Sequence, residues 1–480
     1  MMGQRRVTLF AAICVVVLVV GGLVIYLIPS NQKSVAWGKA LEVRSAPAVA
    51  RGRDVRLTAI SCAAPGDCSA VGNYAVKNNH DRPIVDDETN GVWGKAEALT
   101  GLPARDEGGN TGAYVVSCAS PGNCGAGGTY SVGRNKLLVF VVNEVHGRWG
   151  GIVTVPGVAT LETGGYAYLT SISCPTPGNC SAGGYVASTG GTQAFVLDEV
   201  DGTWGSVLEI AGSASYRMTN SRLESISCAA PGDCSATGNN EAGLARTLPF
   251  VVNEMNGTWG RAEAVPGLGT LSPGGSDYEV NVSCSQPGDC AARGNYLDAS
   301  RVTHAFLVNE SEGVWGSAFA IPGMIALNRR HISQLLSISC AASGDCSAGG
   351  TYGAGSHERA FVVNEVDGTW GDPMMIPGLA SLSQGNFTSV TAVSCGSSGN
   401  CGAIGSFNGH GGYVQVFATN EVNGQWGEAT AIGTPAFAGA IAAYGSAISC
   451  ASTDSCAVVG TFFDAKQNPL PFVEGTETKS

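Results

Sequence analysis

Apolar and polar positions alternate in short runs along most of the chain, and turn residues separate the runs. In one copy, LESISC (223–228) alternates apolar and small polar residues, and CSATG (234–238) follows after a turn. FVVNE (250–254) is rich in β-branched residues, and an Asn-Gly turn then leads into TWG (258–260). Alternation of this kind predicts β-strands, and Asn-Gly between two apolar runs indicates a hairpin. The pattern therefore predicts a unit of four short strands.

This unit occurs eight times. Every Trp is followed by Gly, and successive Trp residues are 55 or 56 positions apart: Trp37, Trp93, Trp149, Trp204, Trp259, Trp315, Trp370 and Trp426. Sixteen of the 17 cysteines form eight C-x5-C pairs, one in each unit. Four strands in about 55 residues fit one blade of a β-propeller, where known repeats have about 40–50 residues. The sequence thus predicts an all-β fold, an eight-bladed β-propeller.

The two ends of the repeat region indicate how the array is closed. The first repeat-like segment, VAWGKALEV (35–43), matches a fourth strand, whereas LPFVEGT (470–476) matches a third strand. The two ends complete one blade only if the array closes into a ring, because an open array would leave pairing edges exposed. We expect the propeller over residues 35–476, closed by its N-terminal strand, with a tail over 477–480.

An apolar segment precedes the repeats. Residues 7–28 are uncharged and mostly apolar, long enough to cross a bilayer as one helix, and Arg5 and Arg6 precede them. We expect a cytoplasmic N-terminus over 1–6, a transmembrane signal anchor over 7–28 and a linker over 29–34. The chain would then be a single-pass protein of the cell membrane with an extracytoplasmic propeller. A cleaved signal peptide ending near Ser34-Val35-Ala36 is the alternative, but its apolar stretch is normally shorter.

The repeat also resembles known families. CSAGGTY (346–352), followed by the NExxGxWGxxxxxPG pattern, resembles a kelch-type propeller blade, although Asn240 stands at the aromatic position in one copy. The unit with a Cys pair and Trp-Gly resembles repeats in surface proteins of high-GC Gram-positive bacteria, over roughly residues 35–475. The resemblance implies a propeller at the cell surface, and it implies no particular activity.

The cysteine pairs are open to three interpretations: zinc ligands, a redox switch or disulfides. A structural zinc site needs four ligands, and no His occurs at a fixed place beside the pairs. Pro-Gly in the gap suits a type II turn that brings the two cysteines together. Export also supplies oxidising conditions. We therefore predict eight structural disulfides, Cys62–Cys68, Cys118–Cys124, Cys174–Cys180, Cys228–Cys234, Cys284–Cys290, Cys340–Cys346, Cys395–Cys401 and Cys450–Cys456.

Two of the four connections barely change between units, namely the Cys-turn-Cys loop and the NExxG turn, and both should lie on one rim. Asn/Asp-Glu pairs such as Asn143-Glu144 could be read as calcium ligands, but they lack the spacing of known calcium loops. Polar residues that end a strand before a turn are the favoured interpretation. The sequence therefore predicts no metal site and no cofactor.

The other two connections vary in length and chemistry and should share the opposite rim. Variable loops on a rigid scaffold are typical of a recognition surface, although each polar residue taken alone is better explained as solvated. The candidate ligand-binding residues are Arg105, Tyr166, Tyr168, Tyr216, Arg217, Tyr278, Arg329, Arg330, His331, His80, His304, His357 and His410.

Charge and motifs narrow the function. The net charge is −12, which disfavours nucleic acid and anionic lipid surfaces as partners. No phosphate loop, H-E-x-x-H motif or nucleophile elbow occurs. We expect a non-catalytic recognition or scaffolding module for a surface protein, a peptide or a cell-wall glycan, with the constant rim facing the membrane. The alternatives are a propeller enzyme acting on glycans, as a hydrolase or lyase, and a purely structural surface protein.

Overall fold

The protein is described here from a computed structural model. It describes residues 16–20, 23–27, 36–45, 49, 53–76, 80–102, 109, 111–133, 136–212, 220–242, 246–273, 277–328, 332–433 and 439–477.

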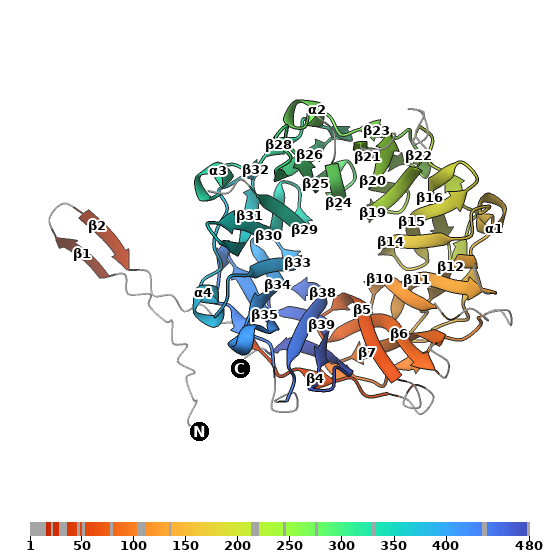
Figure 1. Cartoon of the computed structure of the whole chain (residues 1–480), viewed down its shortest axis with the longest axis horizontal. Helices are drawn as coiled ribbons and strands as arrows, with labels where there is room; N and C mark the ends of the chain where they lie inside the picture. Colours follow the sequence, from red (N-terminus) through yellow and green to blue (C-terminus); the bar gives the residue numbers. More distant parts are fainter. Residues whose placement is uncertain are drawn as a thin grey trace, which may run out of the picture.

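Eight repeated antiparallel sheets stand in a ring, and within each sheet consecutive strands run outward from the centre (Figure 1). The innermost strands are β5 (Arg53–Ala64), β10 (Gly112–Ser120), β14 (Ala167–Thr176), β19 (Asn220–Ala230), β24 (Asp277–Gln286), β29 (Ser333–Ala342), β33 (Thr388–Ser397) and β38 (Ala442–Ser452). The second strands are β6 (Asp67–Val76), β11 (Asn123–Val132), β15 (Asn179–Ser188), β20 (Asp233–Ala242), β25 (Asp289–Leu297), β30 (Asp345–Ala354), β34 (Asn400–Asn408) and β39 (Ser455–Phe463).

Third strands and short outer strands complete each sheet. The third strands are β7 (His80–Thr89), β12 (Lys136–Asn143), β16 (Gly191–Val200), β21 (Arg246–Met255), β26 (Thr303–Ser311), β31 (His357–Val366), β35 (Val414–Val422) and β40 (Pro469–Glu477). The outer edges carry two-residue strands: β8 (Val92–Trp93), β9 (Glu97–Ala98), β13 (Val153–Thr154), β17 (Thr203–Trp204), β18 (Leu208–Glu209), β22 (Thr258–Trp259), β23 (Glu263–Ala264), β27 (Val314–Trp315), β28 (Phe319–Ala320), β32 (Thr369–Trp370), β36 (Gln425–Trp426) and β37 (Thr430–Ala431). One-turn helices lie in four connections between sheets: α1 (Val158–Leu161), α2 (Leu268–Leu271), α3 (Met324–Leu327) and α4 (Leu379–Leu382).

The ring closes as the sequence predicts. The strands β3 (Ala36–Trp37) and β4 (Leu41–Glu42) pair with β40, so the first strands of the ring complete the last sheet. Each innermost strand packs against that of the next sheet, and β38 packs against β5. The architecture is therefore a propeller-like ring of eight repeated sheets (Figure 1).

Hydrogen bonds between neighbouring sheets run around the whole ring. In each unit a Ser precedes the first Cys, and its hydroxyl oxygen accepts the backbone N–H of the corresponding Cys in the next sheet. Cys118 N–H donates to Ser61 Oγ at 2.9 Å, and Cys62 N–H donates to Ser449 Oγ at 2.9 Å, which closes the circle. The same bond occurs at the six other interfaces. All eight predicted disulfides are confirmed.

The core lies between successive sheets. Seven of the third strands contribute one fully buried Phe, and β7 places Ile84 at the same position. These seven residues are Phe140, Phe195, Phe250, Phe306, Phe361, Phe417 and Phe472. Full burial of a Phe side chain is worth about 1.5–3 kcal/mol relative to exposure. One large apolar residue per sheet therefore provides much of the packing that holds adjacent sheets together.

A bulge in the first strand explains the recurrent glycine in the second. The pairing of β29 with β30 shifts between Leu335 and Ser337, and Gly350 lies opposite this bulge. A Cβ atom on Gly350 would lie 1.8 Å from the backbone oxygen of Gln334, and Gly72 faces Arg56 in the same way at 1.9 Å. A side chain at these positions would require the two backbones to separate. The glycine is therefore a packing requirement of the repeat.

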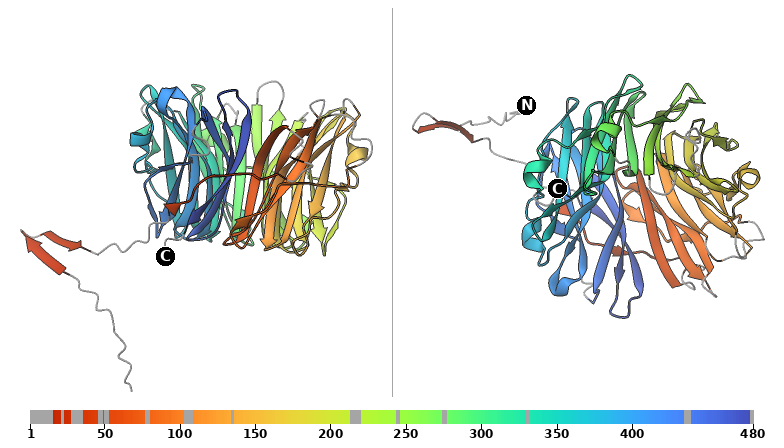
Figure 2. Two further views of the ribbon diagram at one scale, coloured as in Figure 1. Left: turned by 90° about the horizontal axis from the view of Figure 1, so that it is seen from below. Right: turned by 45° about the horizontal axis from the view of Figure 1, so that its top comes forward.

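The N-terminal segment differs from the predicted helix where it is described. The strands β1 (Val16–Val20) and β2 (Leu23–Leu27) pair as an antiparallel hairpin that lies outside the ring (Figure 2). Valine and isoleucine favour strands, and Gly-Gly between two such runs is a hairpin signal, so the sequence also suits this structure. In the described part of the chain, no helix combines the length and apolar character that a membrane crossing requires. The predicted residues 1–6 and 29–34 lie outside the described residues.

Candidate functional site

The two constant turns lie together on one rim, which we call the disulfide rim. In seven sheets, the glycine of the NExxG turn donates its N–H to the carbonyl of the glycine in the Cys-turn-Cys loop, as Gly91 does to Gly66 at 2.8 Å. The chain also enters the ring at this rim, because Trp37 pairs with Thr476, and the Thr476 hydroxyl donates to the Asp454 carbonyl in the last of these loops. The predicted grouping of the two turns is confirmed.

The other two kinds of connection meet on the opposite rim, which we call the variable rim. Leu137, which begins the third strand of one sheet, donates its N–H to the Gly165 carbonyl at the entry to the next sheet. Asp81 donates to Gly109 and Glu358 donates to Asn386 in the same way. Residues at the variable rim therefore belong to neighbouring sheets and are held by backbone hydrogen bonds.

The predicted histidines begin third strands or their connections and do not form one site. His80, His304 and His357 are half-buried and belong to three different sheets. His304 lies 3.1 Å from Asp298 Oδ2, and its ring packs at 5.4 Å from Tyr296. Hydrogen bonds from the Val302 backbone and from His304 lower the pKa of Asp298. His304 therefore orders its own loop.

Some predicted residues are outside what the structure describes. The backbone of Tyr278 lies in β24, and that of His410 lies in the short helix η2 (His410–Gly412), but their side chains are outside the described part of the molecule. The remaining six are outside it entirely: Arg105, Tyr216, Arg217, Arg329, Arg330 and His331.

Two predicted tyrosines do come together with a third aromatic residue. Tyr166 and Tyr168 have ring centroids 5.8 Å apart, and both rings contact Tyr185 of β15, at 6.4 and 5.4 Å. The guanidinium of Arg222, from the next sheet, lies 5.0 Å from the Tyr185 centroid. Burial raises the pKa of Tyr185, and the Arg222 charge opposes this. We call these four residues the tyrosine cluster.

Charged side chains continue from the tyrosine cluster along the inner strands. Burial raises the pKa of Glu224, which lies near Arg222, Glu279 and Arg293. Arg293 is 3% exposed, donates to the Leu335 and Leu336 carbonyls and lies 3.8 Å from Glu279, and burial lowers its pKa to about 10. Glu224, Glu279 and Arg293 therefore add charges of both signs near Arg222 of the tyrosine cluster.

Tyr185 and Arg222 were not among the sequence candidates. Tyr185 occupies a second-strand position where other units carry Thr, Asn or Ser, and Arg222 is a charged residue in an innermost strand. Tyr185 departs from the repeat, so a comparison of aligned strand positions would have found it. The position of Arg222 varies between units, with Arg56, Tyr168 and Tyr444 among its equivalents, so the repeat gives no signal for Arg222.

At the disulfide rim, a polar relay joins neighbouring sheets. At six of the eight interfaces, the Trp of one sheet donates its indole N–H to the Asn or Asp of the preceding sheet, as in Trp370 to Asn309 Oδ1 at 3.0 Å. The Asn Nδ2 then donates to the Glu of the following sheet, as Asn309 does to Glu365. The Asn/Asp-Glu pairs are therefore more than polar strand ends, because each residue of a pair bonds to a different neighbour.

Two interfaces carry Asp in place of Asn. Asp87 faces Glu144, and Asp198 faces Glu254. Burial, together with the opposing aspartate, raises the pKa of Glu144 and of Glu254 to about 7. At these interfaces a carboxylate meets a carboxylate where the other copies have an amide donor.

A cavity of about 780 Å³ opens at the first of these interfaces. Acidic residues dominate its charged lining: Asp67, Asp87, Glu88, Glu97 and Glu144, against Lys95 and Arg148. Glu144 is 5% exposed, and its Oε2 atom has no hydrogen-bond partner among the described residues. This cavity was missed because its two principal carboxylates come from different repeats. The sequence signal is DDE (86–88), which replaces the usual VNE.

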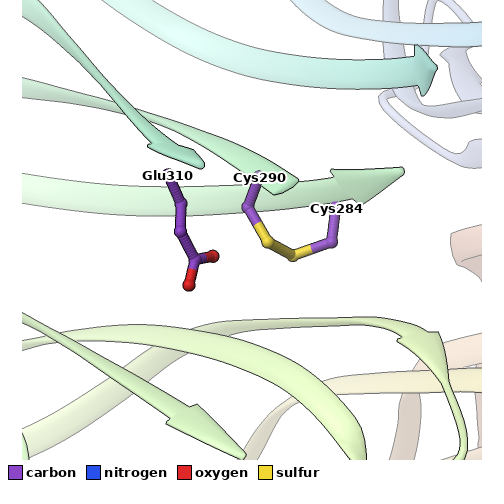
Figure 3. Close-up of side chains that lie close together, drawn as sticks. All are labelled: Cys284, Cys290 and Glu310. Carbon is purple, nitrogen blue, oxygen red and sulfur yellow. A yellow bond between two sulfur atoms is a disulfide. The ribbon is translucent and has the colours of Figure 1, made fainter. Parts of the chain in front are cut away.

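One group resembles a metal site by distance alone. Cys284, Cys290 and Glu310 form the only group of three potential ligands within 4.8 Å of one another in the described chain (Figure 3). The two cysteines are joined as a disulfide, so neither offers a thiolate. Glu310 accepts hydrogen bonds from Asn253 and Ser235. We therefore assign this group a structural role.

The ring of sheets defines the class of the protein, and comparison with known proteins names no family. The class is a propeller-like all-β fold with a cysteine pair in each sheet. No protein-family model matches the chain, and no curated protein matches it in sequence.

Similar solved structures include a protein of unknown function from Dyadobacter fermentans, with a TM-score of 0.38 and 11% identity over 70% of this chain and 98% of that one. A Trypanosoma rangeli sialidase in complex with the inhibitor DANA has a TM-score of 0.36 and 8% identity, over 88% of this chain and 55% of the sialidase. An ulvan lyase of polysaccharide lyase family PL25 has a TM-score of 0.42 and 10% identity, over 76% of this chain and 92% of the lyase. Likeness at this level carries no argument about function.

Proposed function

We propose that the protein is a non-catalytic recognition module that binds an acidic cell-wall glycan at its variable rim. The tyrosine cluster carries this proposal. Three half-buried aromatic rings on neighbouring strands offer apolar faces against which sugar rings can pack, and their hydroxyl groups offer hydrogen bonds. The Arg222 guanidinium beside Tyr185 is suited to a carboxylate on the same ligand. A peptide or a surface protein is the alternative ligand.

The proposal also includes the type of propeller and the cellular location of the protein. We infer an eight-bladed, kelch-like propeller of the cell surface, with residues 7–28 as its membrane anchor. Because the chain enters the ring at the disulfide rim, an anchor at its N-terminus would hold that rim toward the membrane. The variable rim would then face outward, where a cell-wall ligand is accessible. An epitope inserted near Arg329 should be accessible to antibody on intact cells, and an inaccessible epitope would contradict this orientation.

A glycan hydrolase or lyase is the second candidate. Glu224 and Glu279 come from the innermost strands of neighbouring sheets, close enough for Glu279 to contribute to the raised pKa of Glu224. Glycoside hydrolysis needs two carboxyl groups that flank the scissile bond. Arg293 and Arg222 lie near them and could neutralise one carboxylate. A purely structural surface protein would need none of these groups.

The test is binding of the full-length protein, purified in detergent, to a panel of acidic and neutral glycans and to surface peptides. Tyr168→Ala and Arg222→Ala should each weaken binding of the acidic glycan at least about tenfold, and Tyr168→Phe should retain most of it. Tyr444→Ala is the matched control, because Tyr444 is an exposed aromatic residue on an innermost strand of another sheet. Unchanged binding by Tyr168→Ala would reject the site. Glycan cleavage that Glu224→Gln abolishes would favour the enzyme.

A further inference from the structure

The interfaces of the disulfide rim provide an internal comparison. At four of these interfaces, an Asn side-chain amide bridges two residues of the following sheet. Its Oδ1 atom accepts the indole N–H of a Trp, and its Nδ2 atom donates to a Glu. The four Asn–Glu pairs are Asn143–Glu199, Asn253–Glu310, Asn309–Glu365 and Asn364–Glu421. In these copies the buried glutamate has a donor from the preceding sheet.

The interface of Asp87 with Glu144 lacks that donor. Trp149 Nε1 donates to Asp87 Oδ2 at 2.9 Å, as in the other copies. Asp87 Oδ1 and Glu144 Oε2 are both buried and have no hydrogen-bond partner within the described chain. Ser69 is within reach of both carboxylates, but a hydroxyl has only one proton to donate. Neither oxygen is hydrogen-bonded within the described residues, and Ser69 could supply a donor to only one of them.

A cavity lies beside this pair of buried oxygens. Asp87 and Glu144 line it, and its volume of about 780 Å³ leaves room for several water molecules. Asp67, Glu88 and Glu97 add further negative charge to its wall. An unpartnered carboxylate oxygen on a side chain that is only 5% exposed is costly unless a positive group binds it. The site is thus suited to a hydrated cation.

We propose that Asp87 and Glu144 bind a divalent cation, with Ca²⁺ as the chemically favoured ion, at the mouth of the cavity between β7 and β12. All available ligands are oxygens, which favour Ca²⁺ over softer metals. Two protein carboxylates leave most coordination positions to water, so the affinity should be in the range of weak extracellular calcium sites, about 0.1–1 mM. The sequence alone did not predict this site, because its two ligands, Asp87 and Glu144, belong to different repeats.

The second Asp–Glu interface is a built-in control. Trp259 shares its N–H between both oxygens of Asp198, at 3.3 and 3.2 Å, so neither oxygen is without a partner. Glu254 Oε2 alone remains unpartnered there within the described residues. A cation at this interface would find one free oxygen instead of two. The proposal therefore places binding at Asp87 and Glu144 and not at Asp198 and Glu254.

The experiment uses the full-length protein in detergent, stripped with chelator and titrated with CaCl₂ by calorimetry. One Ca²⁺ should bind per chain. Asp87→Asn should abolish binding or weaken it at least about tenfold, and because it recreates the amide found at four other interfaces, it should fold. Glu144→Gln should have the same effect, whereas Asp198→Asn should leave binding unchanged.

A second measurement separates cation binding from folding. Saturating Ca²⁺ should raise the melting temperature of the wild type by a few degrees and leave that of Asp87→Asn unchanged, since binding to the folded state alone stabilises it. No binding to the wild type up to about 10 mM, well above the expected Kd, would overturn the proposal. Equal binding by Asp87→Asn would also overturn it. A wild type that binds no Ca²⁺ and is less stable than Asp87→Asn at neutral pH would also overturn the proposal. That result would indicate that a proton shared by the Asp87 and Glu144 carboxyl groups takes the place of the cation.

Discussion

The two rims of the ring are built from the same repeat and differ in what they hold constant. At the disulfide rim, equivalent residues make equivalent bonds at interface after interface, as the Ser61–Cys118 and Ser449–Cys62 hydrogen bonds illustrate. At the variable rim, backbone hydrogen bonds recur but side chains differ, and only one sheet carries the Tyr166, Tyr168 and Tyr185 contacts. One rim therefore keeps the sheets together, and the other is free to acquire specificity.

Reduction of the disulfides is expected to be the most damaging change to the constant rim. Each bridge closes a short loop and is worth about 2 kcal/mol on the chain-entropy account, and there are eight of them. Thermal unfolding followed by circular dichroism should shift to a much lower temperature with reductant. In unreduced, denatured protein, thiol titration should find one thiol per chain, Cys14. Several reactive thiols would contradict the structure.

A methyl group at the bulge should have the next largest effect. Gly350→Ala places Cβ 1.8 Å from the Gln334 oxygen, and the overpacking should cost about 3 kcal/mol or more in unfolding free energy. Gly190→Ala in a variable-rim connection is the matched control, since its Cβ would meet no atom within 4 Å, and its effect should stay within about 0.5 kcal/mol. Urea unfolding of both variants measures the contrast. Similar losses of unfolding free energy in the two variants would contradict the proposed difference between the strand bulge and the variable-rim connection.

Stability should depend on pH through the buried glutamates of the relay. Burial raises the pKa of Glu365 to about 7, with Asp345 contributing. Below about pH 4.5 the Glu365 carboxyl is protonated in both the folded and the unfolded chain. Between pH 4.5 and 7 it is ionised in the unfolded chain and still protonated in the folded one. Its contribution to stability is therefore fully present at low pH and is lost as the pH rises to 7, by an amount on the order of 2 kcal/mol.

Urea unfolding at several pH values between 4.5 and 8 measures this loss. Glu365→Gln should flatten the profile, because the amide oxygen can still accept from Asn309 and has no proton to lose. A profile that Glu365→Gln leaves unchanged would assign the dependence to other groups.

Removing one donor from the relay should have a smaller effect. Trp370→Phe removes the indole N–H that binds Asn309 Oδ1 at 3.0 Å, together with part of a buried ring. The buried amide oxygen then lacks its donor, at a cost of about 1–2 kcal/mol. Denaturant unfolding checks the value, with Trp37→Phe as the matched control for the lost packing, because Trp37 Nε1 has no hydrogen-bond partner among the described residues. A cost below about 0.3 kcal/mol would show that the relay adds little to stability.

Substitution at the variable rim should affect stability least. His357 is half-buried and lies 3.2 Å from Ser356, its neighbour in the chain. His357→Ala should change the unfolding free energy by no more than about 0.5 kcal/mol. The same denaturant series measures it. A loss above about 1 kcal/mol would mean that this rim also contributes to the packing of the ring.

The sequence predicts the features that repeat and misses those that depend on neighbouring sheets. Trp and Cys spacing is sufficient to predict eight sheets, eight disulfides and closure by the first strand. The Asn309–Glu365 and Asp87–Glu144 pairs were not predicted, because the partners belong to successive repeats and face each other only once the sheets stack. Hydrophobicity alone also could not distinguish a helix from the described β1–β2 hairpin, since β-branched residues suit both a membrane helix and a strand.

Closure of the ring by β3 has a consequence for the order of folding. The strand made first in the ring pairs with β40, which is made last, so almost the whole array separates the two partners. Until β40 emerges, the last sheet is incomplete and an open β-edge remains available to another chain. Such non-local pairing is slow to form. A helper that shields unpaired strands, or rapid degradation of truncated chains, would therefore matter more for this protein during synthesis than after the ring has closed.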